Sequence, residues 1–236
     1  MKWLEFILSL VSRFLNGNKE GTSNLLLDTV NNLTTNHEQT FTNQNNNSIS
    51  ISELFLQLDK MGYYKYTHPS RLEEVKKEDI KNDYFSGWDT GRIFLADAES
   101  LGQHGVADFF KYYDDEMKGT LEKQSVEEFL KNQNVIINVS DEHRDTDGYY
   151  IIINGCKYEI YSEKEINEDW WTLSSVRCFS IINKLLKEAG SKERIYALAD
   201  GNDQNAIFLT EEMYELINSC NYLQEKSKPR NIGNAF

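Results

Sequence analysis

The sequence predicts an α+β fold, in which an N-terminal helical region precedes an antiparallel sheet with helices on one face. Two observations lead to this prediction. Apolar residues recur at helical spacing up to residue 132, and strand-like alternation begins at residue 133. The expected order of the second half is β-β-β-α-β-β-α. Consecutive strands in this order are joined by short loops, and short loops join antiparallel strands.

Composition and charge narrow the classes of protein to which the chain can belong. The 236 residues carry a net charge of −13, and 12% of them are aromatic. Nucleic-acid binding is not expected, because it requires clustered Lys and Arg that release counterions from phosphates. The aromatic content is not that of a disordered protein. The acidic charge indicates either simple solubility or a basic partner.

Residues 1–49 differ in character from the rest of the chain. Residues 3–15 predict an amphipathic helix, and an Asn-rich polar linker follows it. The apolar run is too short to span a membrane, and Glu5 and Arg13 interrupt it, which does not fit a secretory leader. We expect this helix to pack on the body of the protein or on a larger complex.

The remainder is expected to form one domain over 50–224, helical over 50–132 and sheet-containing over 133–224. Residues 225–236 are polar, so we expect a tail that frays.

Helix boundaries are marked by local signals. Three Ser-x-x-Glu capping boxes predict helix starts at 50–53, 70–73 and 125–128. A long helix is expected at about 169–189, with Gly190 ending it. Thr210 is expected to cap the last helix, whose first turn contains two glutamates.

A β-hairpin is the clearest local prediction. Asn154-Gly155 between two β-rich runs favours a two-residue type I′ turn. The turn sets the register and places six residues on the core face. The expected pairs are Ile153 with Cys156, Ile151 with Tyr158, and Tyr149 with Ile160.

The polar stretch 141–147 is expected to form a loop before this hairpin and is the densest ionisable cluster. Its candidate binding residues are Asp141, Glu142, Asp145 and Asp147. Acidic side chains here suit a basic partner. The alternative is a divalent-metal site made by His143, Asp145 and Asp147. An EF-hand alignment places His143 and Asn154 where Asp and Glu are required, so the loop does not match that motif.

Two further groups are candidates for binding. Asp200 and Asp203 lie in a Gly- and Asn-rich turn, and such loops often carry function. Trp170 and Trp171 begin the long helix, where adjacent residues point about 100° apart. We expect one indole to face the core and the other to be partly exposed. Trp170 is the candidate anchor for a partner.

No catalytic residue or cofactor is predicted. The three cysteines, Cys156, Cys178 and Cys220, form neither a CxxC pair nor a disulfide framework, and free thiols indicate the cytoplasm. Cys178 lies well inside the long helix, where a buried, inert thiol is expected rather than a nucleophile.

The segment WWTLSSVRCFSIINKLLKEAGSKERIYALADGNDQNAIFLTEEMYELI, residues 170–217, resembles bacterial proteins of unknown function, some of which are immunity partners of polymorphic toxins. The resemblance implies a cytoplasmic protein-binding module without catalysis. It contains no motif that would assign functional residues. The alternative interpretation is an enzyme or metal-binding domain that uses residues 141–147.

Overall fold

The computed structural model describes residues 49–81, 90–96, 101, 104–111, 125–165, 170–198 and 204–232. The chain divides into units of residues 1–47 and 48–236, and every described residue belongs to the second unit. The division lies close to the expected boundary at residue 49. The predicted amphipathic helix at 3–15 and the Asn-rich linker lie outside the described residues.

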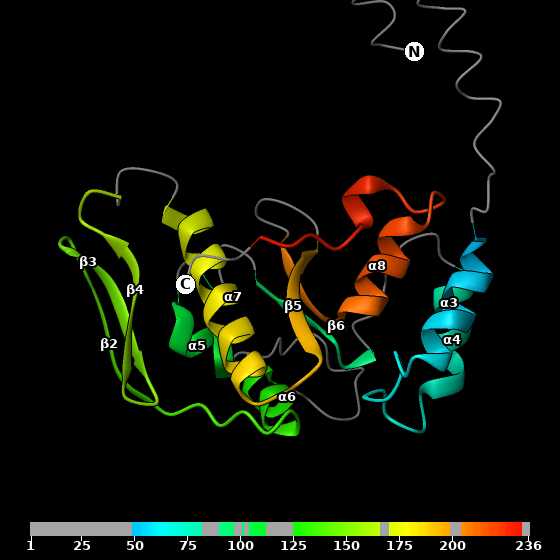
Figure 1. Ribbon diagram of the computed structural model, residues 1–236, viewed down its shortest axis with the longest axis horizontal. Helices are drawn as coiled ribbons and strands as arrows, with labels where there is room; N and C mark the ends of the chain where they lie inside the picture. The colour runs from blue at the N-terminus through cyan, green and yellow to red at the C-terminus, as the bar shows by residue number, and fades with distance from the viewer. Residues whose placement is uncertain are drawn as a thin grey trace, which may run out of the picture. The chain divides into compact units, whose positions relative to one another are not determined.

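The strands form two antiparallel sheets of three strands each (Figure 1). In one sheet the order is β1 (Ile93–Leu95), β6 (Asn205–Thr210), β5 (Glu193–Leu198), and in the other it is β2 (Val139–Asp145), β3 (Gly148–Ile153), β4 (Cys156–Ser162). The α+β class and the strand and helix order of the second half are confirmed. The expectation of a single sheet is wrong.

Capping side chains satisfy backbone amides at the start of three of the described helices. The described helices are α3 (Ile51–Lys60), α4 (Leu72–Lys81), α5 (Val106–Lys111), α6 (Val126–Asn132), α7 (Trp170–Glu188), α8 (Glu211–Ser219) and the 3-10 turn η4 (Glu225–Ser227). Ser50 and Thr210 cap α3 and α8, and Ser125 forms a complete capping box with Glu128. The box expected at Ser70 does not start α4, because the Ser70 hydroxyl contacts His68 Nδ1 at 2.9 Å.

Helix α7 lies between the two sheets and contacts strands β4 and β5 (Figure 1). Its buried residues include Cys178, Phe179, Ile182 and Leu186, which share one core with the inner faces of both sheets. The broad apolar surface of this helix packs on β4 of one sheet and on β5 of the other. This is the physical reason why the strands separate into two sheets.

The β1–β6–β5 sheet is covered on both faces. Phe208 of β6 belongs to the core with α7, whereas its neighbours Ile207 and Leu209 belong to a second core with α3 and α8. Successive strand residues point to opposite faces, so both faces of this sheet are apolar. The expectation that helices cover one face is therefore wrong for this sheet.

The β3–β4 hairpin confirms the predicted turn. Asn154 and Gly155 have φ angles of 52° and 79°, as a type I′ turn requires. Ile153 pairs with Cys156, and Ile151 pairs with Tyr158, as expected.

The hairpin register departs from the prediction farther from the turn. Tyr149 pairs with Tyr161 instead of Ile160, because a bulge shifts the register. Ile160 and Tyr161 are consequently both buried. Cys156, expected on the core face, is exposed, although its partner Ile153 is buried.

A fully buried arginine joins elements that are distant in sequence. Arg92, which precedes β1, is 0% exposed, and its Nη1 lies 2.9 Å from Glu193 Oε2 at the start of β5. The same guanidinium donates to the backbone carbonyls of Phe208, Tyr63 and Gly62 at 2.8, 2.5 and 3.1 Å. Every contact crosses between chain segments, so this side chain holds β1, β5, β6 and the turn after α3 together.

The Glu193 carboxylate has two further partners besides Arg92. Lys65 Nζ lies 2.9 Å from Glu193 Oε1, and the Tyr66 hydroxyl donates to the same oxygen at 3.4 Å. Tyr66 also accepts a hydrogen bond from Gln133, which follows α6. Burial by itself would raise the pKa of the Glu193 carboxyl, but Arg92 and Lys65 outweigh it and hold that pKa below its ordinary value.

Part of the C-terminal segment packs against the body. The backbones of Arg230 and Ala197 exchange hydrogen bonds of 2.8 and 2.9 Å, which adds a bridge at the edge of β5. Lys228 is buried and donates to Glu225 and to the carbonyl of Asn218. The expectation of a fraying tail is therefore wrong for residues 225–232, because the edge of β5 supplies hydrogen-bonding partners.

Among the described helices, none has both the length and the apolar character needed to cross a membrane.

Replacement of Arg92 should unfold the protein at a lower urea concentration. Arg92→Met leaves Glu193 buried without its main partner, and we expect a loss of about 3–5 kcal/mol in the free energy of unfolding. The matched control is Lys65→Met, which removes a 46% exposed partner of the same carboxylate. It should cost less than about 1 kcal/mol. Similar small losses in both variants would show that the buried pair does not organise the fold.

Candidate functional site

The predicted acidic loop is largely a strand. Residues 139–145 form β2, which pairs with β3 along its length, and only Thr146 and Asp147 form the turn. Strand-like alternation in the sequence begins at residue 133, but the strand itself begins only at Val139. Pairing with the apolar strand β3 satisfies the backbone of this charged segment, although its residue types favour a loop.

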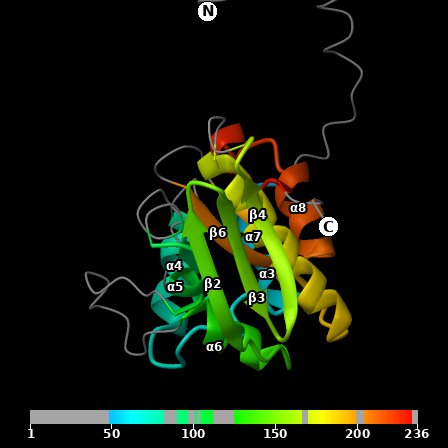
Figure 2. The same ribbon diagram turned by 90° about the vertical axis from the view of Figure 1, so that its left-hand side faces the viewer.

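Strand pairing sorts the candidate residues onto two faces. Asp141 and His143 pair with Ile152 and Tyr150, so they lie on the outer face of the sheet. Glu142 and Arg144 pair with the buried residues Ile151 and Tyr149 and lie on the inner face. Figure 2 shows the outer face toward the viewer, with no described helix in front of it.

The outer face consists of side chains from three strands and one turn. Its members are Asp141, His143, Asp145, Asp147, Tyr150, Ile152, Lys157 and Glu159. The four carboxylates and Lys157 are exposed. The predicted hairpin register puts the alternating residues on the core face and so leaves Tyr150, Ile152, Lys157 and Glu159 on the other side, but it does not place them next to the acidic residues.

An ordered stack lies at the centre of the outer face. The His143 and Tyr150 rings stack with centroids 5.3 Å apart, and Lys157 Nζ lies 3.8 Å from the Tyr150 centroid. The Tyr150 hydroxyl donates to Asp141 Oδ2 at 3.1 Å, and this bond raises the pKa of the tyrosine. The stack positions the surrounding carboxylates without burying them.

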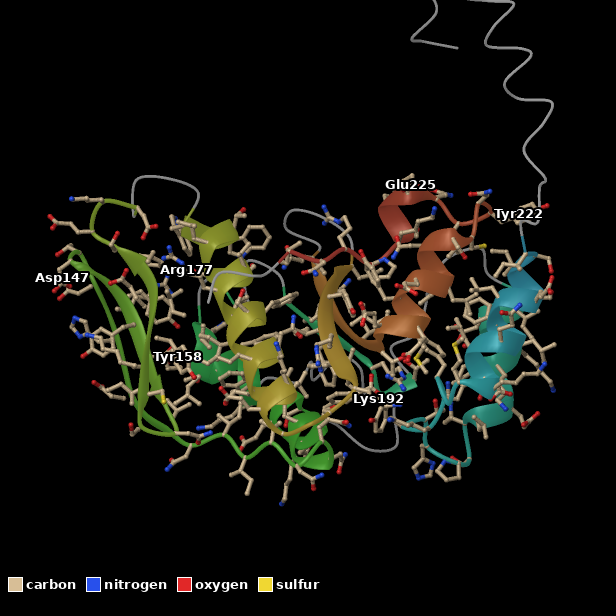
Figure 3. All side chains as sticks on the ribbon, viewed as in Figure 1. Asp147, Tyr158, Arg177, Lys192, Tyr222 and Glu225 are labelled. Atoms are coloured by element: carbon tan, nitrogen blue, oxygen red, sulfur yellow. The ribbon has the colours of Figure 1, made fainter. Side chains whose placement is uncertain are left out.

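The three residues of the metal-site alternative do meet in space. One ligand atom each from His143, Asp145 and Asp147 lies within 4.8 Å of the others. His143 Nε2 is 3.5 Å from Asp147 Oδ1, and these side chains are 44% and 75% exposed. Asp147 lies at the tip of the β2–β3 hairpin (Figure 3). Imidazole and carboxylate groups could ligate a divalent ion, with solvent completing the coordination.

Glu142 has a structural role that the sequence analysis did not foresee. Its carboxylate accepts hydrogen bonds from the Tyr149 hydroxyl and from the Ala107 amide at 3.2 Å. The Val106 amide donates to the Tyr149 hydroxyl at 2.7 Å. Glu142 and Tyr149 thus cap the first turn of α5. Glu142 was expected to bind a partner, but its carboxylate faces the interior and is already engaged.

Gly105 permits this capping arrangement. Its φ is +97°, and an added Cβ would lie 3.0 Å from Glu142 Oε1 and 3.1 Å from the Tyr149 hydroxyl oxygen. A side chain at this position would therefore both strain the backbone and crowd the cap.

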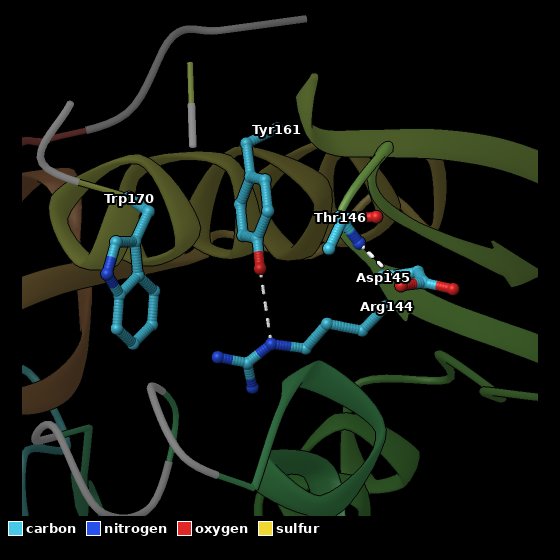
Figure 4. Close-up of a pocket in the computed structure, with 5 residues that line it drawn as sticks. All are labelled: Arg144, Asp145, Thr146, Tyr161 and Trp170. Atoms are coloured by element: carbon cyan, nitrogen blue, oxygen red, sulfur yellow. Dashed lines mark hydrogen bonds between the residues drawn. The ribbon is translucent and has the colours of Figure 1, made fainter. Parts of the chain in front are cut away.

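A pocket of about 400 Å³ lies on the inner side of the hairpin tip (Figure 4). Arg144, Asp145, Thr146, Tyr161 and Trp170 line it. Arg144 Nε donates to the Tyr161 hydroxyl at 3.2 Å, and its guanidinium carbon lies 5.1 Å from the Trp170 ring centroid. Arg144 and Tyr161 were not singled out from the sequence, because the bulge that brings Tyr161 inward has no local signal.

Trp170 and Trp171 are both partly buried. Trp170 packs against the core and meets Tyr161 edge to face at 6.5 Å. The Trp171 indole nitrogen is buried and has no hydrogen-bond partner among the described residues. Trp170 is therefore a pocket wall with Arg144 beside its ring, not a freely exposed anchor. Asp200 and Asp203 lie outside the described residues.

The interior contains no activated thiol within the described ranges. Cys178 is fully buried, and burial raises the pKa of its thiol well above the ordinary value. Its neighbour Arg177 instead binds Glu165 at 2.8 and 3.1 Å and donates to Ile160 O at 2.7 Å. Hydrogen bonds from Arg177 and Ser162 lower the pKa of Glu165 to about 2.

Adjacent residues of β2 lie on opposite faces of the sheet, so we expect their substitutions to differ in how much they lower stability. Glu142→Ala removes the cap of α5 and should lower the free energy of unfolding by about 1–3 kcal/mol. Asp141→Ala, one residue earlier on the outer face, should change it by less than about 0.5 kcal/mol. Urea unfolding followed by circular dichroism measures both. Equal effects would show that Glu142 does not stabilise the fold through this cap.

In comparisons with known proteins, no family model, curated protein or solved structure matches the chain. The resemblance to immunity proteins therefore stays a hypothesis.

Proposed function

We propose that this chain is a protein-binding module that uses the outer face of the β2–β3–β4 sheet to bind a basic partner, without catalysis. The observation that supports the proposal is an ordered and exposed face on which four carboxylates surround one lysine and one histidine. A potential of one sign over a face steers an oppositely charged partner and excludes acidic ones.

The arrangement suits binding better than acid–base catalysis. Its carboxylates are exposed, and the pocket behind them places Arg144 against Tyr161 and Trp170, with no cysteine, serine or histidine among its lining residues. Immunity proteins of the kind that the segment 170–217 resembles act by surface complementarity. An immunity-type function in the cytoplasm is therefore the specific form of this proposal.

Charge neutralisation on the outer face should weaken partner binding. The variant Asp141→Asn/Asp145→Asn/Asp147→Asn keeps the side-chain shapes and removes three charges. The matched control, Glu73→Gln/Glu78→Gln/Glu215→Gln, removes three exposed charges on α4 and α8. Proteins that bind the immobilised wild type in a lysate of the native host are identified and purified, and their affinities are measured against salt.

We expect the wild type and the control to bind alike. The outer-face variant should bind at least about tenfold more weakly, because three charge pairs of about 0.5–1 kcal/mol each are lost. Its affinity should also depend less on salt. If all three proteins bind a partner equally, or no specific partner is retained, the proposed function is wrong.

A divalent-metal site is the second candidate, and the proximity of His143, Asp145 and Asp147 favours it. A metal at 100 times its dissociation constant should stabilise the protein by about 2.7 kcal/mol, or roughly 5–10 °C in melting temperature. Asp147→Asn should abolish the shift, whereas Glu159→Gln on the same face should keep it. A melting temperature that no divalent ion changes would eliminate this candidate.

A further inference from the structure

The edge of β4 presents unused backbone groups. Ile153 and Cys156 close a two-residue turn, so their backbones exchange both hydrogen bonds, and Tyr158 continues this pattern. Lys157 and Glu159 lie between these positions, so their N–H and C=O groups point away from β3. Both residues are exposed.

These edge groups have no partner within the described ranges. No hydrogen bond is made there by the backbone of Lys157 or Glu159 beyond the sheet, and the Glu159 carboxylate has neither an ion pair nor a hydrogen bond. Farther along, Arg177 donates to Ile160 O at 2.7 Å and closes the edge. The available stretch is therefore short and centred on Tyr158.

We propose that a second copy of this chain pairs with this stretch, so that two β4 strands run antiparallel about a two-fold axis at Tyr158. In this register Lys157 lies opposite the partner's Glu159, and Glu159 lies opposite the partner's Lys157. Cross-strand pairs of opposite charge stabilise antiparallel strands. The self-complementary surface is what a two-fold symmetric interface requires.

The backbone independently supports the same register. Pairing about Tyr158 sets the outward N–H and C=O groups of Lys157 against those of the partner's Glu159, which also point outward. All of these groups then find hydrogen-bonding partners. If the two strands shifted by one residue, the outward N–H and C=O groups of Lys157 and Glu159 would face partner groups that are already bonded to β3. The shift would also separate Lys157 from the partner's Glu159.

Strand β2, the opposite edge of this sheet, shows the contrast. A symmetric antiparallel pairing centred on His143 would set Asp141 opposite the partner's Asp145 on the outer face. It would also set Glu142 opposite the partner's Arg144, but these two side chains are already engaged within their own chain, Glu142 with Ala107 and Tyr149 and Arg144 with Tyr161. Like charges directly opposite destabilise strand pairing. The outer-face charges of β2 therefore oppose self-association, whereas those of β4 favour it, and the partner copy is expected at β4.

Pairing at β4 would have a consequence for binding. Because the axis is perpendicular to the joined sheet, both outer faces would lie on the same side. The dimer would offer two acidic faces to one large partner or to two small ones. The inference stands whether or not a basic partner exists, since it depends only on β4.

Charge reversal with rescue tests the pairing. Sedimentation of the full chain over a series of concentrations gives the dimer dissociation constant. Glu159→Lys sets lysine against lysine and should weaken the dimer at least about tenfold. Lys157→Glu should do the same, and the swap Lys157→Glu/Glu159→Lys should restore the dimer. Glu215→Lys on α8, which makes the same change of charge at an exposed residue of another element, is the matched control and should leave it unchanged.

A second measurement reports the contact itself. A carbodiimide should join Lys157 to the partner's Glu159 through an amide, and mixed ¹⁴N and ¹⁵N chains distinguish this link from one within a chain. Melting curves verify that each variant folds. A wild type that is monomeric at every concentration, single variants that dimerise like the wild type, or a swap that fails to restore the dimer would each overturn the inference.

Discussion

The buried pair of Arg92 and Glu193 is the interaction on which the rest of the fold depends. A charged pair without solvent is stable only when its remaining donors and acceptors are satisfied. Here Arg92 also binds the carbonyls of Phe208, Tyr63 and Gly62. The partners come from β5, β6 and the turn after α3, so the pair forms only when these segments have assembled. It therefore selects one arrangement of the elements.

Helix α7 connects the sheet that contains this pair to the second sheet. It packs on β5, whose first residue is Glu193, and on β4 of the hairpin sheet. Arg177 adds a polar link by binding both Glu165 and the Ile160 carbonyl. Because much of the inner face of the β2–β3–β4 sheet is buried by this packing, its outer face is left for solvent or a partner.

Both proposals concern this outer sheet but use different parts of it. The acidic outer face would bind a basic protein, and the edge of β4 would bind a second copy. The first depends on four carboxylates, three of them on β2 and its turn, and the second on the backbone edge of β4 with Lys157 and Glu159. Charge explains both roles: an excess of one sign favours a foreign partner, whereas an alternating pair favours the same chain.

The sequence by itself determined the local elements. The Asn154-Gly155 turn, the capping box of Ser125 and Glu128, and the end of α7 near Gly190 depend on a few adjacent residues, whose backbone preferences are strong. The α+β class and the strand order also followed from apolar spacing. The meeting of His143, Asp145 and Asp147 was foreseen as an alternative, because they lie within five positions.

Only the tertiary structure decided how these elements combine. Nothing local distinguishes one sheet from two, because the choice depends on which surfaces α7 covers. The polar segment 139–145 became a strand because β3 supplies its partner, and Glu142 turned inward because α5 requires a cap. Arg92 carries no signal in the sequence, since its partners lie up to 116 positions away. Long-range contacts of this kind exist only after the chain has folded, so the role of each charged residue depends on the tertiary structure.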